Sequence, residues 1–418
     1  MTRLIPDADL QAGLSYVFSF FESRHHLHAG RYDRVVRQPA VFLDIALRHA
    51  ILPRPECTIV VTGSKGKGSC ARMTTAYLQR QAYRVGLVLT PEEHDHLDRI
   101  RINDDPIAAV DFLRILETLK PDLERAMQQA GDSFYHPPTS IFLLVALKYF
   151  RERQVDYVVV EGGRGAQFDE IGQLSAAVGI VTSIFPEHLS RLGPELRDIC
   201  TDKFSVTRTC RVVICSGQAW QKAQEHAPGL IATEALHVVP APMRKGDRPD
   251  WVGTADSLAR AAIAQLGKAS DPQLMTSLSL PSCEVITSGQ SPCMTADQCV
   301  MLDGAISADC LDLIYMASKA CRPGGFVLAM TADKDVAGIM KILQDHFALP
   351  IYLFRPVSRS GHVAAPAGID EWAGNFDVEQ GLDGNSRRNL LAILNRHSRL
   401  YVIGVQLFLR SVRNALKS

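Results

Sequence analysis

The sequence has no long apolar run and no predominant sign of charge. No segment approaches the roughly 20 apolar residues of a membrane-spanning helix, and Pro6 and Asp7 interrupt the N-terminus before a signal-like apolar core can form. The 45 basic residues balance 45 acidic ones, which disfavours nucleic-acid and membrane partners. Ten cysteines include no CxxC pair, so we expect reduced thiols rather than a zinc or disulfide framework. These absences predict a globular, cytoplasmic protein.

The chain does contain an alternation of strand-like and helix-like segments, which predicts an α/β fold with a doubly wound parallel sheet. The predicted strands form two series, at residues 58–62, 157–161, 178–184 and 212–215, and at residues 300–303, 326–330, 351–354 and 401–403. A polar stretch without sustained periodicity at residues 268–281 separates the two series. We therefore predict a large domain at residues 1–270 and a smaller α/β domain at residues 275–418.

The most informative segment is Gly63-Ser64-Lys65-Gly66-Lys67-Gly68-Ser69, which follows an apolar, β-branched run and opens a helix-like stretch that starts at Ser69. Its glycines allow a tight turn whose N–H groups point at an anion. The helix N-terminus and Lys67 add positive charge for a terminal phosphate, and Ser69 supplies a hydroxyl suited to Mg²⁺. The spacing between these glycines and Lys67 is shorter than in the standard phosphate-binding motif GxxxxGK[ST]. The alternative to a phosphate-binding loop is an ordinary glycine-rich turn with a solvated lysine. The order of strand, glycines, Lys and Ser favours a P-loop that binds ATP.

Further motifs follow the loop in a fixed order. They are Val85-Gly86-Leu87, Thr90-Pro91, residues 98–103, Val160-Glu161-Gly162-Gly163-Arg164-Gly165 with Asp169, residues 181–184 with His188, Leu192-Gly193, Lys203, Asp303-Gly304-Ala305 and residues 332–335. From about residue 55 onward this string resembles the folylpolyglutamate synthases, a branch of the Mur ligase superfamily. The resemblance implies a P-loop-containing central domain with a mostly parallel, doubly wound sheet, followed by a smaller C-terminal Rossmann-like α/β domain.

The resemblance also implies a reaction. Enzymes of this family transfer the γ-phosphate of ATP to a substrate carboxylate, and an amine then attacks the acyl phosphate to form an amide. Such phosphoryl transfer requires positioning and charge neutralisation more than covalent participation of the protein. The implied cofactors are ATP and one or two Mg²⁺ ions, and the implied partners are a small-molecule carboxylate and an amine.

Individual site residues follow from the matched motifs. Lys67 and the loop amides would hold the β- and γ-phosphates, and Asp303 would contact the ribose. Ser69, Thr90, Glu161 and His188 match metal-site positions, where Thr90 replaces a family serine. Lys203 matches the lysine that the family carbamylates to help place a second Mg²⁺. The resemblance therefore makes Lys67, His188 and Lys203 the candidate catalytic residues.

Each of these residues has a structural alternative. Glu161 ends a buried strand, where an acid needs a partner or a metal. His188 could be an ordinary surface-loop histidine, and Lys203 could be a solvated helix lysine. Two further polar clusters, His25-His26-Leu27-His28 and residues 92–96, match no ligand geometry, and we expect both to be solvated surface.

The departures from the family pattern concentrate on the second substrate and on ATP. Ile306 and Val405 stand where the family has a histidine and a serine that contact glutamate. An apolar residue leaves the charged groups of glutamate unpaired, at about 1–3 kcal/mol for each lost partner. A family arginine falls near Ser282 and Cys283, and an asparagine falls near Ala259. The inserted Arg164 could supply charge from another direction.

Three functions remain open on the sequence. The first is an ATP-dependent, ADP-forming ligase that joins a carboxylate to an amine other than glutamate. The second is a nucleotide-binding, catalytically degenerate homologue with a binding or regulatory role. The third is folylpolyglutamate synthesis itself. Retention of Lys67, Ser69, Glu161, His188 and Lys203 together favours catalysis, because a protein without the reaction has no need for the metal set.

Overall fold

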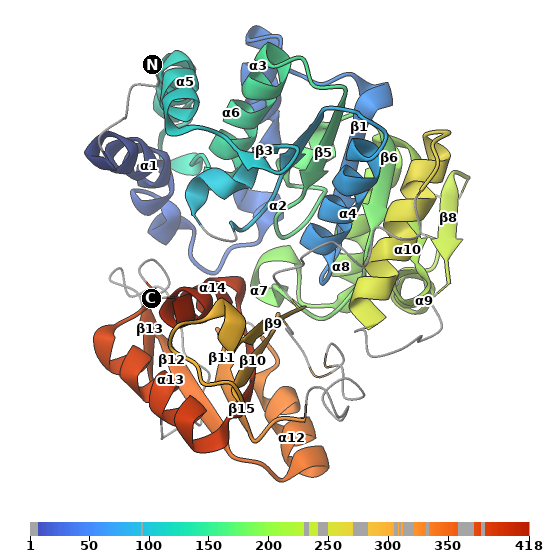
Figure 1. Cartoon of the computed structure of the whole chain (residues 1–418). Helices are drawn as coiled ribbons and strands as arrows, with labels where there is room; N and C mark the ends of the chain where they lie inside the picture. Colours follow the sequence, from blue (N-terminus) through green and yellow to red (C-terminus); the bar gives the residue numbers. More distant parts are fainter. Residues whose placement is uncertain are drawn as a thin grey trace. The chain divides into compact units, whose positions relative to one another are not determined.

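A computed structural model describes residues 7–92, 95–229, 234–240, 250–270, 283–304, 308, 311, 322–331, 334–357, 372–377 and 381–417. The chain divides into two compact units. The first comprises Met1–Pro242 and Thr254–Ser277, and the second comprises Met243–Gly253 and Leu278–Ser418. Each unit has its own sheet (Figure 1) and its own apolar core.

The first unit is built on a sheet of eight described strands in the order β4-β3-β2-β5-β1-β6-β7-β8. Neighbours from β2 to β8 are parallel, whereas β3 and β4 add an antiparallel edge. The central strands are buried and β-branched, as expected for strands that are covered on both faces. The strands are β1 (Thr58–Thr62), β2 (Val85–Val88), β3 (Ile100–Ile102), β4 (Asp105–Pro106), β5 (Tyr157–Glu161), β6 (Ala176–Val181), β7 (Cys210–Ser216) and β8 (Leu236–Val239).

Helices flank this sheet. The helix that follows β1, α4, packs on β1, β2 and β5, and α6 packs on β2 and β3. The described helices of this part of the chain are α1 (Asp7–Glu22), α2 (Asp33–Val36), α3 (Pro39–Arg48), α4 (Lys67–Gln79), α5 (Ala109–Ala130), α6 (Pro138–Glu152), α7 (Leu189–Leu192), α8 (Leu196–Lys203), α9 (Gly217–His226) and α10 (Asp250–Gln265). Eight of them, α1 to α3 and α5 to α9, contribute buried side chains to one apolar core.

The second unit has a mostly parallel sheet of seven described strands in the order β14-β13-β12-β11-β15-β10-β9, with β9 and β14 antiparallel to their neighbours. Its strands are β9 (Cys283–Thr287), β10 (Cys299–Asp303), β11 (Gly325–Ala329), β12 (Ile351–Val357), β13 (Gly374–Asp377), β14 (Gly381–Leu382) and β15 (Arg399–Gly404). Its described helices are α12 (Val336–Phe347), α13 (Gly384–His397) and α14 (Gln406–Lys417).

The predicted fold class is confirmed, because both units are α/β with mostly parallel sheets. Each of the eight predicted strands overlaps an observed strand, although two elements near the loop have different ends. The predicted helix at Ser69 begins earlier, at Lys67, because Gly66 with φ of 87° forms its N-cap. The strand predicted to reach residue 184 ends at Val181, because the following residues leave the sheet to contact the glycine-rich loop.

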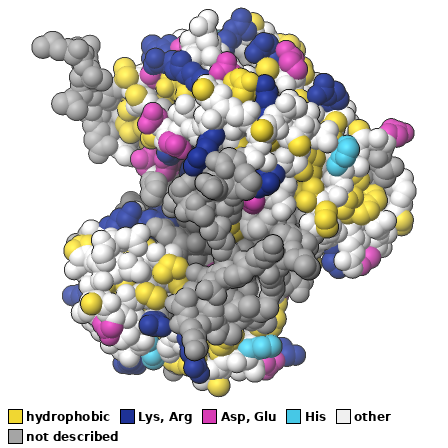
Figure 2. Space-filling model, turned by 45° about the vertical axis from the view of Figure 1, so that its right-hand side comes forward, with side chains coloured by type: hydrophobic (Ala, Val, Ile, Leu, Met, Phe, Trp, Pro, Cys, Tyr) yellow, Lys and Arg dark blue, Asp and Glu magenta, His cyan; other side chains and the backbone are white. Residues whose placement is uncertain are grey.

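The surface carries charges of both signs. On the face shown in Figure 2, basic and acidic side chains are interspersed with apolar ones, in agreement with the formal net charge of zero. Among the helices of the described ranges, none is both long enough and apolar enough to cross a membrane.

Candidate functional site

Three adjacent parallel strands end at one edge of the first sheet. Val61 of β1 is in register with Glu161 at the end of β5, and Thr62 is in register with Val181 at the end of β6. Open parallel sheets bind ligands beyond the carboxyl ends of their strands. The topology therefore brings the glycine-rich loop, Glu161 and the segment after β6 to the same edge (Figure 1).

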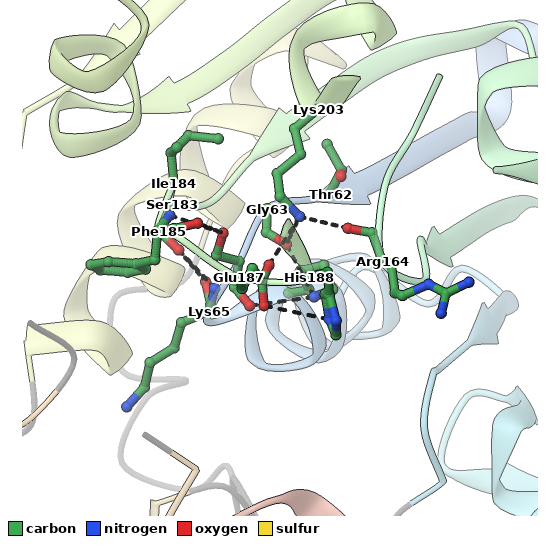
Figure 3. A network of polar contacts seen from close by, with 12 residues as sticks. Thr62, Gly63, Lys65, Arg164, Ser183, Ile184, Phe185, Glu187, His188 and Lys203 are labelled. Carbon is green, nitrogen blue, oxygen red and sulfur yellow. Dashed lines mark hydrogen bonds and ion pairs between the residues drawn. The ribbon is translucent and has the colours of Figure 1, made fainter. Parts of the chain in front are cut away.

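The glycine-rich loop is held by the residues that follow β6. The Ser64 N–H donates to Ser183 O (2.8 Å), and the Phe185 N–H donates to Ser64 Oγ (3.0 Å). The Lys65 N–H donates to Ser183 Oγ (2.8 Å), while Thr182 Oγ1 donates to Lys65 O (2.7 Å). Figure 3 shows Lys65 and Ser183 within this network. These hydrogen bonds therefore fix the loop against the end of β6.

Gly63 and Gly66 have conformations that favour glycine. Gly63 has φ of 133°, and a Cβ atom there would lie 2.1 Å from Thr182 Oγ1 and 2.9 Å from Thr182 N. Gly66 has φ of 87° and directly precedes α4. These two positions permit the close approach of the loop to β6 and the turn into the helix. The glycines predicted to shape the loop are thus required by its geometry.

Lys67 lies in the first turn of α4, with its side chain folded back onto the loop. Its Nζ donates to Gly63 O (3.0 Å) and to Ser64 O (3.4 Å). Ser69 lies in the same helical turn. The ammonium group of Lys67 is therefore beside the backbone that would surround a phosphate, and a change of side-chain rotamer is enough to turn it toward a ligand.

Glu161 lies between this loop and Thr90. Its Oε2 accepts the Thr90 N–H (3.0 Å), and the same oxygen would lie 3.3 Å from a Cβ atom at Gly68. The residue is 8% exposed. Glycine at position 68 therefore leaves room for a buried carboxylate directly beside the start of α4.

His188, Glu187 and Lys203 form a second polar group at this edge (Figure 3). His188 has φ of 51°, and its Nε2 lies 3.7 Å from Glu187 Oε2. Lys203 Nζ lies 3.1 Å from Glu187 Oε1 and donates to Gly63 O (2.9 Å) and Arg164 O (2.7 Å). The alternative of a solvated helix lysine at position 203 is wrong, because this side chain is fully buried.

The environment of Lys203 bears on its chemical form. Burial lowers the pKa of Lys203, whereas Glu187 opposes that change. Two carbonyl oxygens accept hydrogen bonds from Nζ, and the Glu187 carboxylate lies at ion-pair distance, which suits the donors and the charge of an ammonium group. A carbamate would place anionic oxygens among these acceptors. Carbamylation of Lys203 remains a prediction, and the described contacts suit the unmodified side chain.

The segment after Glu161 is tied down by buried charges. Asp202 Oδ1 accepts the Ala166 N–H (2.6 Å), and burial raises the pKa of Asp202 to about 6. Arg37 Nη2 donates to Glu170 Oε2 (2.7 Å), and burial raises the pKa of Glu170 to about 7. Arg164 donates to Asp33 (3.1 Å). Arg164 is therefore engaged by an acid of α2.

Asp303 lies in the second unit, at the end of β10. It is 2% exposed and accepts a hydrogen bond from Tyr401 Oη (3.0 Å). Val405 follows β15, packs against the core of this unit, and donates its N–H to Ala329 O (3.1 Å). Ile306 and Ser282 lie outside the described residues, and Cys283 begins β9.

Ala259, considered above as the counterpart of a family asparagine, is fully buried in α10.

Two expectations of solvated surface are wrong in part, because His26, Leu27 and Asp95 are exposed as expected, whereas His28 and Glu92 are buried. His28 is 3% exposed, and neither of its ring nitrogens has a hydrogen-bond partner among the described residues. Glu92 is 2% exposed and accepts from Arg99 Nε (2.8 Å), while His96 Nδ1 lies 3.2 Å from its other oxygen. The aromatic rings of α1 and α6 that pack over His96 and Arg99 explain this burial. Glu93 and His94 lie outside the described residues.

Sequence reasoning gave no role to Thr182, Ser183 and Glu187. The first two hold the loop, and the third pairs with Lys203. Polar residues placed directly after an apolar strand were the available signal. Among the described residues, no group of three His, Cys, Asp or Glu side chains has an arrangement that could hold a metal ion.

Comparisons with known proteins agree with the motifs. No protein-family model matches the chain. The dihydrofolate synthase/folylpolyglutamate synthase of Escherichia coli K12 is 23% identical over 364 residues, which cover 80% of this chain and 81% of that protein. Seven further relatives are named as folylpolyglutamate synthases, some with a second synthase activity in the name. They are 23–33% identical over only 20–48% of their own length.

Solved structures share the fold over nearly the whole chain. A Mycobacterium tuberculosis folylpolyglutamate synthase, complexed with ADP and AMPPCP, has a TM-score of 0.74 at 16% identity and covers 97% of this chain and 99% of its own. A bifunctional folylpolyglutamate synthase/dihydrofolate synthase from Yersinia pestis, complexed with AMPPNP and a Mn ion, has a TM-score of 0.67 at 18% identity, with coverage of 97% and 96%. The resemblance to the folylpolyglutamate synthases is thus confirmed in sequence and in fold.

Proposed function

We propose that this protein, a divergent relative of the folylpolyglutamate synthases in the Mur ligase superfamily, is an ATP-dependent ligase. It would activate a carboxylate as an acyl phosphate, which an amine then attacks to form an amide. The observation that carries this proposal is the placement of the glycine-rich loop, held by Ser183, beside the buried carboxylate of Glu161. A loop alone would support nucleotide binding only, whereas an acid at the phosphate end suits phosphoryl transfer.

The residues of the loop would bind and orient ATP. The N–H groups at the start of α4 and the ammonium of Lys67 would hold the β- and γ-phosphates, after the side chain leaves Gly63 O and Ser64 O. Because the loop is already held by Ser183, little ordering is required when the nucleotide binds. Preorganised donors of this kind stabilise the charge that develops during phosphoryl transfer.

The chemistry of four side chains near the ends of β1, β2, β5 and β6 suits Mg²⁺. Glu161 would supply a hard carboxylate oxygen, Ser69 and Thr90 would supply hydroxyls, and His188 would supply an imidazole from the segment after β6. Bound Mg²⁺ would supply charge neutralisation for the phosphates. Lys203 and Glu187 would keep the loop and the His188 segment together.

Two amine acceptors compete. The names of the relatives favour glutamate, added to a folate-type carboxylate. Val405 favours a different amine, because its partly buried, apolar side chain packs against the core of the second unit and offers no hydrogen bond to a charged amino acid. Ile306 also favours an amine other than glutamate, because its side chain is apolar. A degenerate homologue that binds nucleotide without turnover is the third reading.

The test is release of ADP from Mg·ATP in the presence of folate and a panel of amines that includes glutamate. A ligase releases ADP only when both substrates are present, and Lys67→Ala abolishes this release. Lys222→Ala, which removes a surface partner of Glu225, is the matched control and retains it. Highest activity with glutamate would assign folylpolyglutamate synthesis, and highest activity with another amine would support the changed acceptor. ATP binding without ADP release for any pair would favour the degenerate homologue.

A further inference from the structure

The first unit has a surface pocket, which we call the α8 pocket, with a volume of about 550 Å³. This size lies within the range of sites that bind small molecules. None of the residues named above as candidate phosphate or metal ligands lines it. Its lining consists of Arg34, Gln167, Phe168, Leu192, Pro194, Glu195, Arg197, Asp198, Thr201 and Asp202.

The α8 pocket is built on the same two chain segments as the candidate active site. Gln167 and Phe168 belong to the segment that follows Glu161, and residues 192–202 lie between His188 and Lys203. The two segments are in close contact, because a Cβ atom at Gly165 would lie 2.3 Å from Asp202 Oδ1. A ligand in this pocket would therefore contact the backbone segments that carry the active-site side chains.

The acids of the pocket already have backbone partners. Asp198 Oδ2 accepts the Glu195 N–H (3.1 Å), and both side chains form a capping box at the start of α8. Asp202 Oδ1 accepts the Ala166 N–H (2.6 Å). These bonds orient the carboxylates toward the protein's own N–H groups.

The basic residues of the pocket are in a different situation. Arg34 and Arg197 are exposed, and neither guanidinium has an ion pair or a hydrogen bond with an acid of the described chain. Arg34 lies over the ring of Tyr32, with 4.6 Å between Cζ and the ring centroid. Guanidinium groups bind carboxylates and phosphates through paired N–H donors. Phe168, Leu192 and Pro194 add apolar surface to the same cavity.

We propose that the α8 pocket binds an anionic small molecule with an apolar body. Arg34 and Arg197 hold its carboxylate or phosphate group, and the apolar body lies against Phe168, Leu192 and Pro194. Such a ligand has two sources, the distal end of the ligase's own carboxylate substrate or a separate anionic metabolite. The first source rests on the function proposed above, and the second does not.

Calorimetric titration of the full-length protein tests the pocket with two probes of equal shape, 2-naphthoate and uncharged 2-naphthamide. We expect naphthoate to bind at least tenfold more tightly than naphthamide, and Arg34→Gln/Arg197→Gln to remove this difference. Arg211→Gln, which changes an exposed arginine on β7, keeps it. Equal affinity of both probes, no binding of naphthoate at millimolar concentration, or an unchanged preference in the double variant would overturn the proposal. A melting temperature equal to that of the wild type verifies that the double variant is folded.

Steady-state kinetics of ADP release distinguishes the two sources. If the pocket holds the distal end of the substrate, the double variant raises KM for the carboxylate at least tenfold with little change in kcat, and naphthoate competes with that substrate. If a separate metabolite binds, KM is unchanged and naphthoate inhibits or activates without competition. Failure of the ligase proposal would appear as no ADP release in the wild type, while the calorimetric result would stand independently.

Discussion

The buried pair of Lys203 and Glu187 gives the sharpest prediction. Lys203→Met removes the ammonium group that lies 3.1 Å from the Glu187 carboxylate, which is 5% exposed, and leaves Gly63 O and Arg164 O without this donor. Removal of one member of a buried ion pair costs about 3–5 kcal/mol. We therefore expect Lys203→Met to lower the free energy of unfolding by about 4 kcal/mol.

The reciprocal variant completes a thermodynamic cycle. Glu187→Gln keeps an acceptor for Nζ but removes its counter-charge, so a loss of about 1.5–3 kcal/mol is expected, the range for a hydrogen bond to a charged group. In the double variant no carboxylate remains without a cation. The double loss should therefore be smaller than the sum of the single losses, by about 2 kcal/mol.

Urea unfolding followed by circular dichroism measures all three variants. Lys222→Met is the control, since its pair with Glu225 is on the surface and such pairs contribute at most about 1 kcal/mol. If Lys203 is carbamylated instead, Glu187 faces an anion, so that Glu187→Gln stabilises the protein and the stability of the wild type increases with added bicarbonate. That outcome, or a loss below 1 kcal/mol for Lys203→Met, would refute the assignment of an ammonium cross-link.

Three further predictions concern nucleotide, pH and metal. ATP at about a hundred times its Kd should stabilise the wild type by about 2.7 kcal/mol, and Lys67→Ala should lose most of this gain in thermal unfolding while its apo melting temperature stays nearly unchanged; an unaltered ATP effect contradicts the phosphate-loop role. Burial raises the pKa of Asp202 from 3.8 to about 6, so the native state binds this proton more tightly than the unfolded state, and Asp202 alone lowers stability by roughly 3 kcal/mol as the pH rises from about 4 to above 6. Asp202→Asn should abolish that part of the pH dependence in urea unfolding at several pH values, and an identical slope in the variant excludes the buried acid as its source. Mn²⁺ titration followed by electron paramagnetic resonance, with AMPPNP present, should show at least tenfold weaker binding in Glu161→Gln and His188→Ala; equal Mn²⁺ affinity in both variants would assign these side chains to structural contacts.

Much of the fold could be predicted because its signal is local. The β-branched run of β1 and the acid that ends β5 are visible as short segments, and the glycines at positions 63 and 66 indicate a special turn. These features depend on residues close in sequence. The fold class and the position of the glycine-rich loop between β1 and α4 followed from them.

The partners of the site could not be predicted, because they depend on tertiary packing. Ser183 reaches the loop because β6 pairs with β1. Lys203 is buried because its helix packs against the segment that contains Arg164. The burial of His28 and Glu92 has the same origin. The composition of a short polar run predicts solvated surface. Helices and strands distant in sequence can nevertheless pack around such a run and bury it.

The attachment of the loop to the end of β6 has a consequence for folding. The hydrogen bonds that shape the loop join residues 117 to 121 positions apart in the chain, so they form only after β6 has docked beside β1. Contacts of such sequence separation close a large loop and form late in folding. A nucleotide therefore cannot help the early chain to fold through this loop. It can bind only to the assembled sheet, and it should slow the unfolding of the whole first unit rather than of the loop alone.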